Sequence, residues 1–275
     1  MQRQITVEIL CIGNELLIGK IQDTNSHWLC TLVNERGGYV TRVTLLRDRT
    51  EEIATAVRDA IEREVDILFT SGGLGPTIDD VTLAAVSIGA GVTLKLNQTA
   101  LHMVEESYDA FARQGILTEG GLNAAREKMA WQPEGGEPLD NPVGTAPGVL
   151  LKVGRTAIIS LPGVSSELKA IVTRSLDQFL KDTFGQGGAL SKTICVRCND
   201  ESIMEPVLSR VVADHPEVYI KSLATTLGKF PEIDITLTVT GKDADDRTML
   251  IDAALRDLRD GLTAIGIVHR NKESA

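Results

Sequence analysis

A glycine-rich stretch at 68–82, L-F-T-S-G-G-L-G-P-T-I-D-D-V-T, has the residue types of an anion-binding turn. It begins in a short apolar segment that is predicted to be a strand. Gly72, Gly73 and Gly75 would let the backbone turn tightly and approach a ligand. A helix predicted to begin near Ile78 would offer unpaired N–H groups and the positive end of its dipole. Together these features predict a phosphate site.

Two adjacent carboxylates, Asp79 and Asp80, follow the glycines. They would repel a bare phosphate, so a divalent cation is expected between the acids and the phosphate. The alternative is that both acids only complement the dipole of the first helical turn. Because two acids follow three glycines at the end of a strand, the functional interpretation is favoured.

The order of the predicted elements brings further acids to the same place. Strands are predicted over 5–12, 39–46 and 65–70, with a helix between each pair. This order gives a parallel sheet with right-handed crossovers, in which ligands bind at the carboxyl ends of the strands. Glu15 follows the first strand and Asp48 follows the second. Both are therefore expected to lie beside the glycine turn.

The predicted fold class is α/β, with a three-layer, mostly parallel sheet and a second, smaller α/β sandwich. A Gly-rich linker at 185–189 separates a domain at 1–184 from one at 190–265. A Pro/Gly-rich loop at 131–148 is long enough to be functional. Further elements are expected as helices at 24–36, 51–63, 82–90, 98–114, 119–129 and 162–182, a hairpin at 149–160, and βαββα elements at 192–198, 201–213, 217–222, 232–240 and 244–260.

The 275 residues carry a net charge of −10 at pH 7, which argues against binding to nucleic acid or to anionic membranes. The sequence has no apolar run of about 18 residues and no signal-peptide block, so a cytoplasmic protein is expected. Its four cysteines are too few for a disulfide scaffold. A structural role is expected for Cys195 and Cys198.

Four separated segments, in order, resemble the molybdopterin-binding (MoCF) domain in the form found in the CinA (competence-damage-inducible protein A) family. They are G-N-E-L-L-I-G-K-I-Q-D-T-N at 13–25, T-S-G-G-L-G-P-T-I-D-D-V-T at 70–82, P-E-G-G-E-P-L-D-N-P-V-G-T-A-P-G at 133–148 and L-P-G-V-S-S-E-L-K at 161–169. The resemblance covers roughly the first 170 residues. One departure is Ser165, where the family commonly has Pro; the turn is still expected to form.

The resemblance implies metal-dependent hydrolysis of a nucleotide pyrophosphate, specifically of ADP-ribose to AMP and ribose 5-phosphate, with Mg²⁺ or Co²⁺ as the metal. Asp80, with Asp79 and Glu15, would hold the cation, and Asp48 would position or deprotonate the attacking water. The substrate-binding residues that the resemblance implies are Gly72, Gly73, Gly75, Thr82, Asp23, Asn25, Asn141, Gly144, Thr145 and Gly148.

Two other functions stay open. One is a molybdopterin-binding protein of molybdenum-cofactor biosynthesis, because such relatives share the glycine turn and the second acid. The other is a non-catalytic regulator that oligomerises. A homodimer or a higher homo-oligomer is expected in each case.

The second domain resembles the KH-type middle domain of CinA proteins. KH domains that bind nucleic acid use a G-x-x-G loop between two helices. The G-x-x-G nearest to this domain, Gly185–Gly188, lies in the linker, so packing or dimerisation is the favoured role. Many CinA proteins also carry a C-terminal amidase domain. This chain ends at Ala275, where that domain would begin, and no amidase activity is expected.

Overall fold

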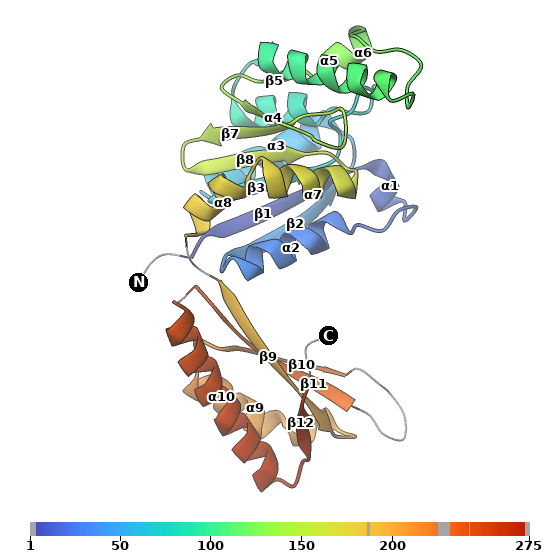
Figure 1. Ribbon diagram of the computed structural model, residues 1–275. Helices are drawn as coiled ribbons and strands as arrows, with labels where there is room; N and C mark the ends of the chain where they lie inside the picture. Colours follow the sequence, from blue (N-terminus) through green and yellow to red (C-terminus); the bar gives the residue numbers. More distant parts are fainter. Residues whose placement is uncertain (1–3, 186–187, 225–231, 242, 273–275) are drawn as a thin grey trace. The chain divides into compact units, whose positions relative to one another are not determined.

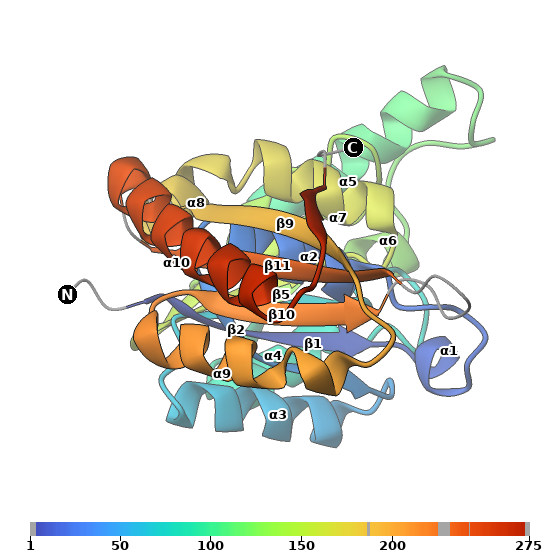
Figure 2. The same ribbon diagram turned by 90° about the horizontal axis from the view of Figure 1, so that it is seen from below.

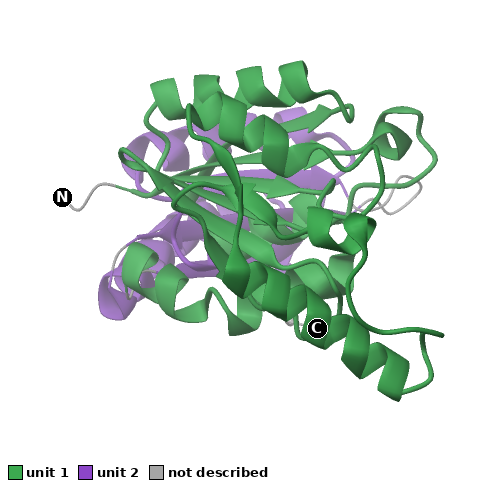
Figure 3. Ribbon diagram, turned by 90° about the horizontal axis from the view of Figure 1, so that it is seen from above, with its two compact units in different colours: residues 1–33, 39–185 green, residues 34–38, 186–275 purple. Residues whose placement is uncertain are grey.

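The computed structural model describes residues 4–185, 188–224, 232–241 and 243–272. The chain divides into two compact units, which Figure 3 shows in different colours. Unit 1 comprises residues 1–33 and 39–185, and unit 2 comprises residues 34–38 and 186–275. The predicted linker at 185–189 includes residues 186–187, which lie outside the described residues.

The centre of unit 1 is a six-stranded sheet with the order β2-β1-β3-β8-β7-β6. The neighbours β2, β1, β3 and β8 are parallel, whereas β7 pairs antiparallel with β8 and β6 antiparallel with β7. The prediction of a mostly parallel α/β sheet is confirmed. The strand bounds are β1 Thr6–Ile12, β2 Tyr39–Leu46, β3 Ile67–Ser71, β6 Glu137–Leu139, β7 Gly148–Val153 and β8 Thr156–Leu161.

Helices cover both faces of this sheet and give unit 1 three layers (Figure 1). Val7, Ile9 and Cys11 of β1 face one core, and Leu10 and Ile12 face the other. This alternation follows from the two-residue period of a strand. It explains the nearly continuous apolar run of β1, which is buried on both sides. The first core includes α2 (Asn25–Glu35), α7 (Ser165–Arg174) and α8 (Asp177–Phe184), and the second includes α3 (Thr50–Glu62) and α4 (Thr82–Ala90).

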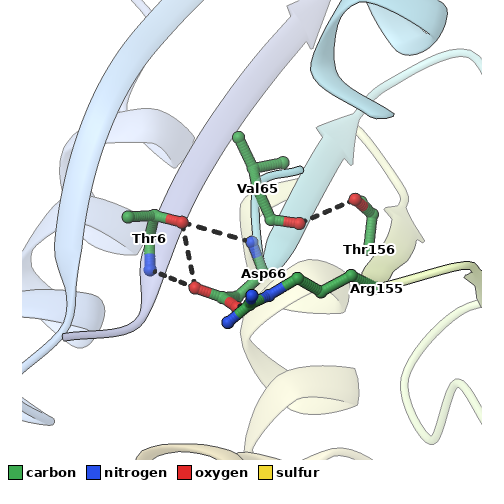
Figure 4. Close-up of polar contacts among 5 residues, drawn as sticks. All are labelled: Thr6, Val65, Asp66, Arg155 and Thr156. Carbon is green, nitrogen blue, oxygen red and sulfur yellow. Dashed lines mark hydrogen bonds and ion pairs between the residues drawn. The ribbon is translucent and has the colours of Figure 1, made fainter. Parts of the chain in front are cut away.

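Polar contacts tie the amino ends of β1, β3 and β8 together (Figure 4). The Asp66 carboxylate accepts hydrogen bonds from Thr6 N and Thr6 Oγ1 over 2.8 and 2.9 Å and from Arg155 Nε over 3.0 Å. Thr156 Oγ1 donates to Val65 O over 2.7 Å. These bonds fix the three strands relative to one another. The carboxyl ends of the strands therefore also lie side by side, at the other end of the sheet.

The helix after the glycine turn begins later than predicted. α4 starts at Thr82 and not near Ile78, so Asp79 and Asp80 lie in a turn that precedes the helix. The physical reason is that Thr77 donates hydrogen bonds to the Asp80 carboxylate and closes a local turn, which competes with helix formation. The predicted helix start near residue 78 is therefore wrong, and the phosphate site at the glycine turn stays a prediction.

Other elements also differ from the prediction. α6 is shorter than the expected helix at 119–129, because Arg126 Nη1 donates to Gly120 O and Gly121 O and holds these residues in a loop. The helix expected over 162–182 is two helices, α7 and α8, separated at 175–176. The other elements of unit 1 are α1 Asn14–Leu17, β4 Leu94–Leu96, α5 Gln98–Arg113, α6 Ala124–Lys128 and β5 Trp131–Pro133.

Unit 2 has a four-stranded antiparallel sheet with the order β10-β11-β9-β12. Helices α9 and α10 pack on one face of it (Figure 2). The βαββα order is present and is followed by one more strand, β12; the resemblance to a KH-type domain stays a prediction. Cys195 and Cys198 are buried free thiols. The bounds are β9 Ala189–Arg197, a 3₁₀ turn at Glu201–Ile203, α9 Glu205–Asp214, β10 Tyr219–Ala224, β11 Glu232–Thr240, α10 Ala244–Ala264 and β12 His269–Asn271.

In the part of the chain that the structure describes, each helix is too short or too polar to cross a membrane.

Candidate functional site

A cleft of about 560 Å³ lies at the carboxyl ends of β1, β3 and β8. This is a common size for a small-molecule site. Its walls come from the loop after β1, the glycine turn after β3 and the loop that leads into α7. The lining includes most of the residues that the sequence singled out: Glu15, Asp23, Asn25, Asp48, Gly72, Gly73, Gly75, Asp79, Asp80 and Thr145.

The glycine turn leaves no room for side chains. Gly72 and Gly73 have φ angles of 106° and 70°, which favour glycine. A Cβ at Gly72 would lie 2.1 Å from Ile12 O, and one at Gly73 would lie 2.2 Å from Thr82 Oγ1. A Cβ at Gly75 would lie 2.7 Å from Asp80 Oδ2. The turn therefore packs directly on β1, on α4 and on the Asp80 carboxylate.

Thr82, the first residue of α4, holds the glycine turn through two hydrogen bonds. Its side chain is fully buried, and its Oγ1 donates to Gly72 O over 2.8 Å. Thr82 N donates to Gly73 O over 3.2 Å. Thr82 does not line the cleft. The structure thus shows that Thr82 holds the glycines, and the ligand contact that the resemblance implies for it stays a prediction.

Thr77 holds both carboxylates of the acid pair. Its N and Oγ1 donate to Asp80 Oδ2 over 2.8 and 2.6 Å, and its Oγ1 also contacts Asp79 Oδ1. Hydrogen bonds from the Thr77 hydroxyl and from the Asp79 backbone amide lower the pKa of Asp79, and the charge of Lys128 lowers it further. Asp79 therefore stays ionised at neutral pH, and Asp80 is fixed beside Gly75.

Asp48 lies in the loop after β2, and Glu15 lies in the short helix α1 that follows β1. Asp48 Oδ2 accepts a hydrogen bond from Asn14 N over 2.8 Å. The Glu15 carboxylate folds over Gly13, where a Cβ would lie 2.5 Å from Glu15 Oε1. Local backbone contacts thus direct both acids to the edge of the sheet that carries the cleft.

Asp23 has a structural task besides its place in the lining of the cleft. Its Oδ1 accepts hydrogen bonds from Asn25 N over 3.1 Å and from Ser26 N over 3.0 Å, and so caps the first turn of α2. Burial raises the pKa of Asp23, but the hydrogen bonds from Ser26, Cys11 and Asn25 together outweigh burial and lower the pKa overall. Asp23 lines the cleft as a charged helix cap.

The cleft is strongly acidic. None of the described residues that line it is Lys, Arg or His. Within the described ranges, no three His, Cys, Asp or Glu side chains are grouped closely enough to hold a metal ion. The pair at 79–80 instead suits a cation whose other ligands are phosphate oxygens and water, which is a common way for proteins to bind Mg²⁺. The carboxylates in the lining are Glu15, Asp23, Asp48, Asp79, Asp80 and Glu167.

A hydrogen-bond network in the wall of the cleft joins α2 to the loop before α7. Asn25 Nδ2 donates to Ser71 Oγ over 2.9 Å and to Gly163 O over 2.8 Å. Ser165 Oγ donates to Asn25 Oδ1 over 2.6 Å. Ser165 thus holds this turn through its hydroxyl group.

The loop at 141–148 is anchored to α7. Asn141 is buried, and its Nδ2 donates to Ala146 O over 2.8 Å and to Glu167 Oε2 over 2.7 Å. Gly144 packs on this contact, because a Cβ there would lie 2.2 Å from Glu167 Oε2. Of the four loop residues that the sequence proposed, only Thr145 lines the cleft among the described residues. Asn141, Gly144 and Gly148 position the loop.

We therefore expect an Asn141→Ala variant to affect both stability and binding. It would leave the buried Ala146 O and the Glu167 carboxylate without their donor, which costs about 1–3 kcal/mol of unfolding free energy. Ligand affinity should fall about tenfold, as for a residue that orients a binding group. Urea unfolding and calorimetric titration measure the two effects. Asn141→Asp should be worse than Asn141→Ala, because it places a carboxylate against Glu167; equal stability of all three proteins would contradict this account.

Several residues of the lining were not predicted as site residues, and three of them carry a polar or nucleophilic group close to the predicted ones. Glu167, Ser165 and Cys11 all line the cleft. Glu167 and Ser165 lie in the segment L-P-G-V-S-S-E-L-K, so their position in a matched segment was a signal that could have found them. Cys11 gave no such signal, because it reads as one more apolar residue of β1. Burial raises the pKa of the Cys11 thiol well above its usual range, and the nearby charge of Asp23 raises it further.

Comparison with known proteins identifies the class. Residues 8–182 match the family model described as a probable molybdopterin binding domain, and the chain belongs to this family. All the residues that line the cleft fall within the matched range. The resemblance of the first unit to a molybdopterin-binding (MoCF) domain is thereby confirmed.

Individual relatives extend the match. A protein of Pyrococcus horikoshii is 37% identical over 226 residues, which cover 82% of this chain and 87% of that protein. A protein of Aeropyrum pernix is 36% identical over 260 residues, which cover 94% of each chain. Among solved structures, the protein CinA with unknown function from Thermoplasma acidophilum is 34% identical, with a TM-score of 0.57, and the match covers 64% of this chain and 98% of that one.

Proposed function

We propose that the cleft of unit 1 binds a phosphorylated heterocycle of the molybdopterin type. The observation that carries this proposal is that the residues of the cleft all lie within the range that matches the probable molybdopterin binding domain. The glycine turn supports it, because Gly72, Gly73 and Gly75 all line the cleft and place backbone at its wall. The position at the carboxyl ends of parallel strands is the usual ligand site of such folds.

We further propose that a divalent cation binds together with the ligand. The lining of the cleft has carboxylates and no cationic side chain, so a phosphate would be repelled without a counter-charge. Asp79 and Asp80 would hold the cation, with Glu15 as a further candidate. The bound cation would neutralise phosphate charge. Since no three acidic or metal-ligating side chains are grouped among the described residues, the metal alone should bind weakly.

Anaerobic calorimetric titration with molybdopterin, with and without Mg²⁺, tests both proposals. We expect binding that strengthens at least tenfold with Mg²⁺, because the cation offsets the charge of six carboxylates, Glu15, Asp23, Asp48, Asp79, Asp80 and Glu167. Neopterin, which has the ring system but no phosphate, is the matched control and should bind weakly with no dependence on Mg²⁺. If molybdopterin fails to bind in either condition, the proposed function is wrong.

The second candidate function is hydrolysis of a nucleotide pyrophosphate, specifically of ADP-ribose. The specific observation in its favour is the set of acids that line the cleft: Asp80 beside Gly75, Asp48 after β2, and Glu15 in α1 after β1. Asp48 would position or deprotonate a water molecule, while the glycine turn holds the phosphates. Incubation with ADP-ribose and Mg²⁺ or Co²⁺, followed by assay for AMP, is the test. Absence of AMP with both metals would eliminate this candidate.

A further inference from the structure

The six-stranded sheet of unit 1 has two edge strands, β6 and β2. β6 has three residues and contains Pro138, and both a short length and a proline keep an edge strand from pairing with another chain. β2 has eight residues, Y-V-T-R-V-T-L-L, with no proline, lysine or acid among them. In unit 2, the edge strand β12 again has three residues, and β10 carries Lys221. Among the edges of these two described sheets, β2 is therefore the long one without a proline or a lysine.

The carboxyl-terminal part of β2, residues 42–46, is the regular part of this edge. The register with β1 shifts at Thr41, where β2 has one residue more than β1, and does not shift again. Among the described residues, no other strand pairs with the outer side of β2. The side chains of Val43 and Leu45 are each 38% exposed, and they lie on the same face of the strand. An apolar surface thus accompanies the open edge.

The backbone groups of Val43 and Leu45 point away from β1. Leu46 O accepts a hydrogen bond from Gly13 N over 3.0 Å, so the backbone groups of Leu46 face the side of β1. Successive residues of a strand point their N–H and C=O groups alternately to its two sides. The groups of Val43 and Leu45 therefore face the open side, where no hydrogen bond to another described segment involves them.

We propose that β2 pairs antiparallel with β2 of a second copy of this chain, about a two-fold axis at Thr44. In this register Val43 of each copy lies opposite Leu45 of the other. The two residues of each pair would exchange both N–H···O=C hydrogen bonds, because their backbone groups point toward each other. Asp48 lines the cleft and follows the end of β2 by two residues, so the interface would border the cleft of each copy.

The sequence of β2 makes a second copy the fitting occupant. Pairing about a two-fold axis requires a surface that is complementary to itself. Val43 and Leu45 are both apolar and equally exposed, so each would cover the other across the axis. Thr44 would meet its own counterpart at the axis. The two Arg42 side chains would lie at opposite ends of the paired segment, too far apart to repel each other strongly.

The proposed interface is small, since it has four backbone hydrogen bonds and two apolar pairs. Small interfaces belong to weak complexes. We therefore expect a dimer that dissociates on dilution. Sedimentation velocity over a range of concentrations measures its dissociation constant. If the unaltered protein is monomeric up to the highest concentration at which it stays in solution, the proposal is wrong.

Cysteine cross-linking tests the register. Thr44→Cys would place two thiols directly opposite each other at the axis, where Cβ atoms lie close enough for a disulfide. We expect a covalent dimer on a non-reducing gel after oxidation with diamide. Arg42→Cys is the matched control, because the two thiols would be more than about 13 Å apart. The unaltered protein shows the background from its four cysteines. Equal yields of covalent dimer from both variants would overturn the register at Thr44.

A charge at the edge tests the surface without a covalent bond. Val43→Lys should weaken the dimer at least about tenfold, because a lysine on an edge strand opposes pairing with another strand. Ile116→Lys is the matched control, since Ile116 is 62% exposed in the loop after α5, and it should leave the dissociation constant unchanged. Thermal unfolding checks that both variants fold. A folded Val43→Lys variant with the dissociation constant of the unaltered protein would place the interface elsewhere and overturn the proposal.

Discussion

An Asp80→Asn variant should lose the metal-dependent part of ligand binding while keeping its fold. Asp80 Oδ2 accepts hydrogen bonds from Thr77 N and Thr77 Oγ1, and the amide oxygen of Asn can accept the same two. The substitution therefore removes the negative charge and leaves the turn intact. If the cleft hydrolyses a nucleotide pyrophosphate, formation of AMP should fall at least about a hundredfold, the lower end for loss of a key catalytic group.

Calorimetric titration with and without Mg²⁺ and the assay for AMP measure these effects, and thermal unfolding checks the fold. Glu105→Gln is the matched control, because it removes one negative charge from an exposed position on α5 outside the cleft. Asp80→Asn with unchanged Mg²⁺ dependence and unchanged turnover would show that Asp80 serves only to close the turn with Thr77.

The sequence was most informative where a residue type admits few conformations. Gly72 and Gly73 predicted a tight turn, and both have positive φ. The apolar run of β1 predicted a doubly buried parallel strand, and its side chains reach both cores. These features depend on local chemistry, so a single sequence can reveal them.

Features that depend on competition between local contacts were harder to predict. Residues 78–81 have acids suited to a first helical turn, but the hydrogen bonds of Thr77 to Asp80 hold them in a separate turn. The predicted helix start was wrong because both outcomes use the same residue types. The same competition shortened α6, where Arg126 binds the backbone carbonyls of Gly120 and Gly121.

Features that depend on tertiary contacts gave no signal along the chain. Asn141 and Glu167 are 26 residues apart, and their contact exists only because the 141–148 loop packs on α7. Asn141 and Thr145 were both predicted to contact the ligand, but of these two only Thr145 lines the cleft, together with Glu167, which was not predicted. In the same way, Trp131 and Leu83 share a cavity only in the folded chain.

The largest expected loss of stability comes from a methyl group at Gly72. Gly72→Ala adds a Cβ that would lie 2.1 Å from the backbone atom Ile12 O, at a φ of 106°. Backbone atoms of β1 cannot move aside without breaking the sheet, so the cost combines backbone strain with overpacking. We expect the free energy of unfolding to fall by roughly 3 kcal/mol or more. Ligand binding should be lost as well, because the turn must shift.

Gly91→Ala separates the two causes of this loss. Gly91 has a φ of 69°, but no atom lies within 4 Å of the position that its Cβ would take. This variant therefore carries the strain without the clash and should cost only about 1–2 kcal/mol. Urea unfolding followed by tryptophan fluorescence reports on unit 1, because Trp28 and Trp131 both lie there. Equal destabilisation by the two substitutions would mean that the close approach of the glycine turn to β1 contributes nothing, and that left-handed backbone geometry alone requires glycine at residue 72.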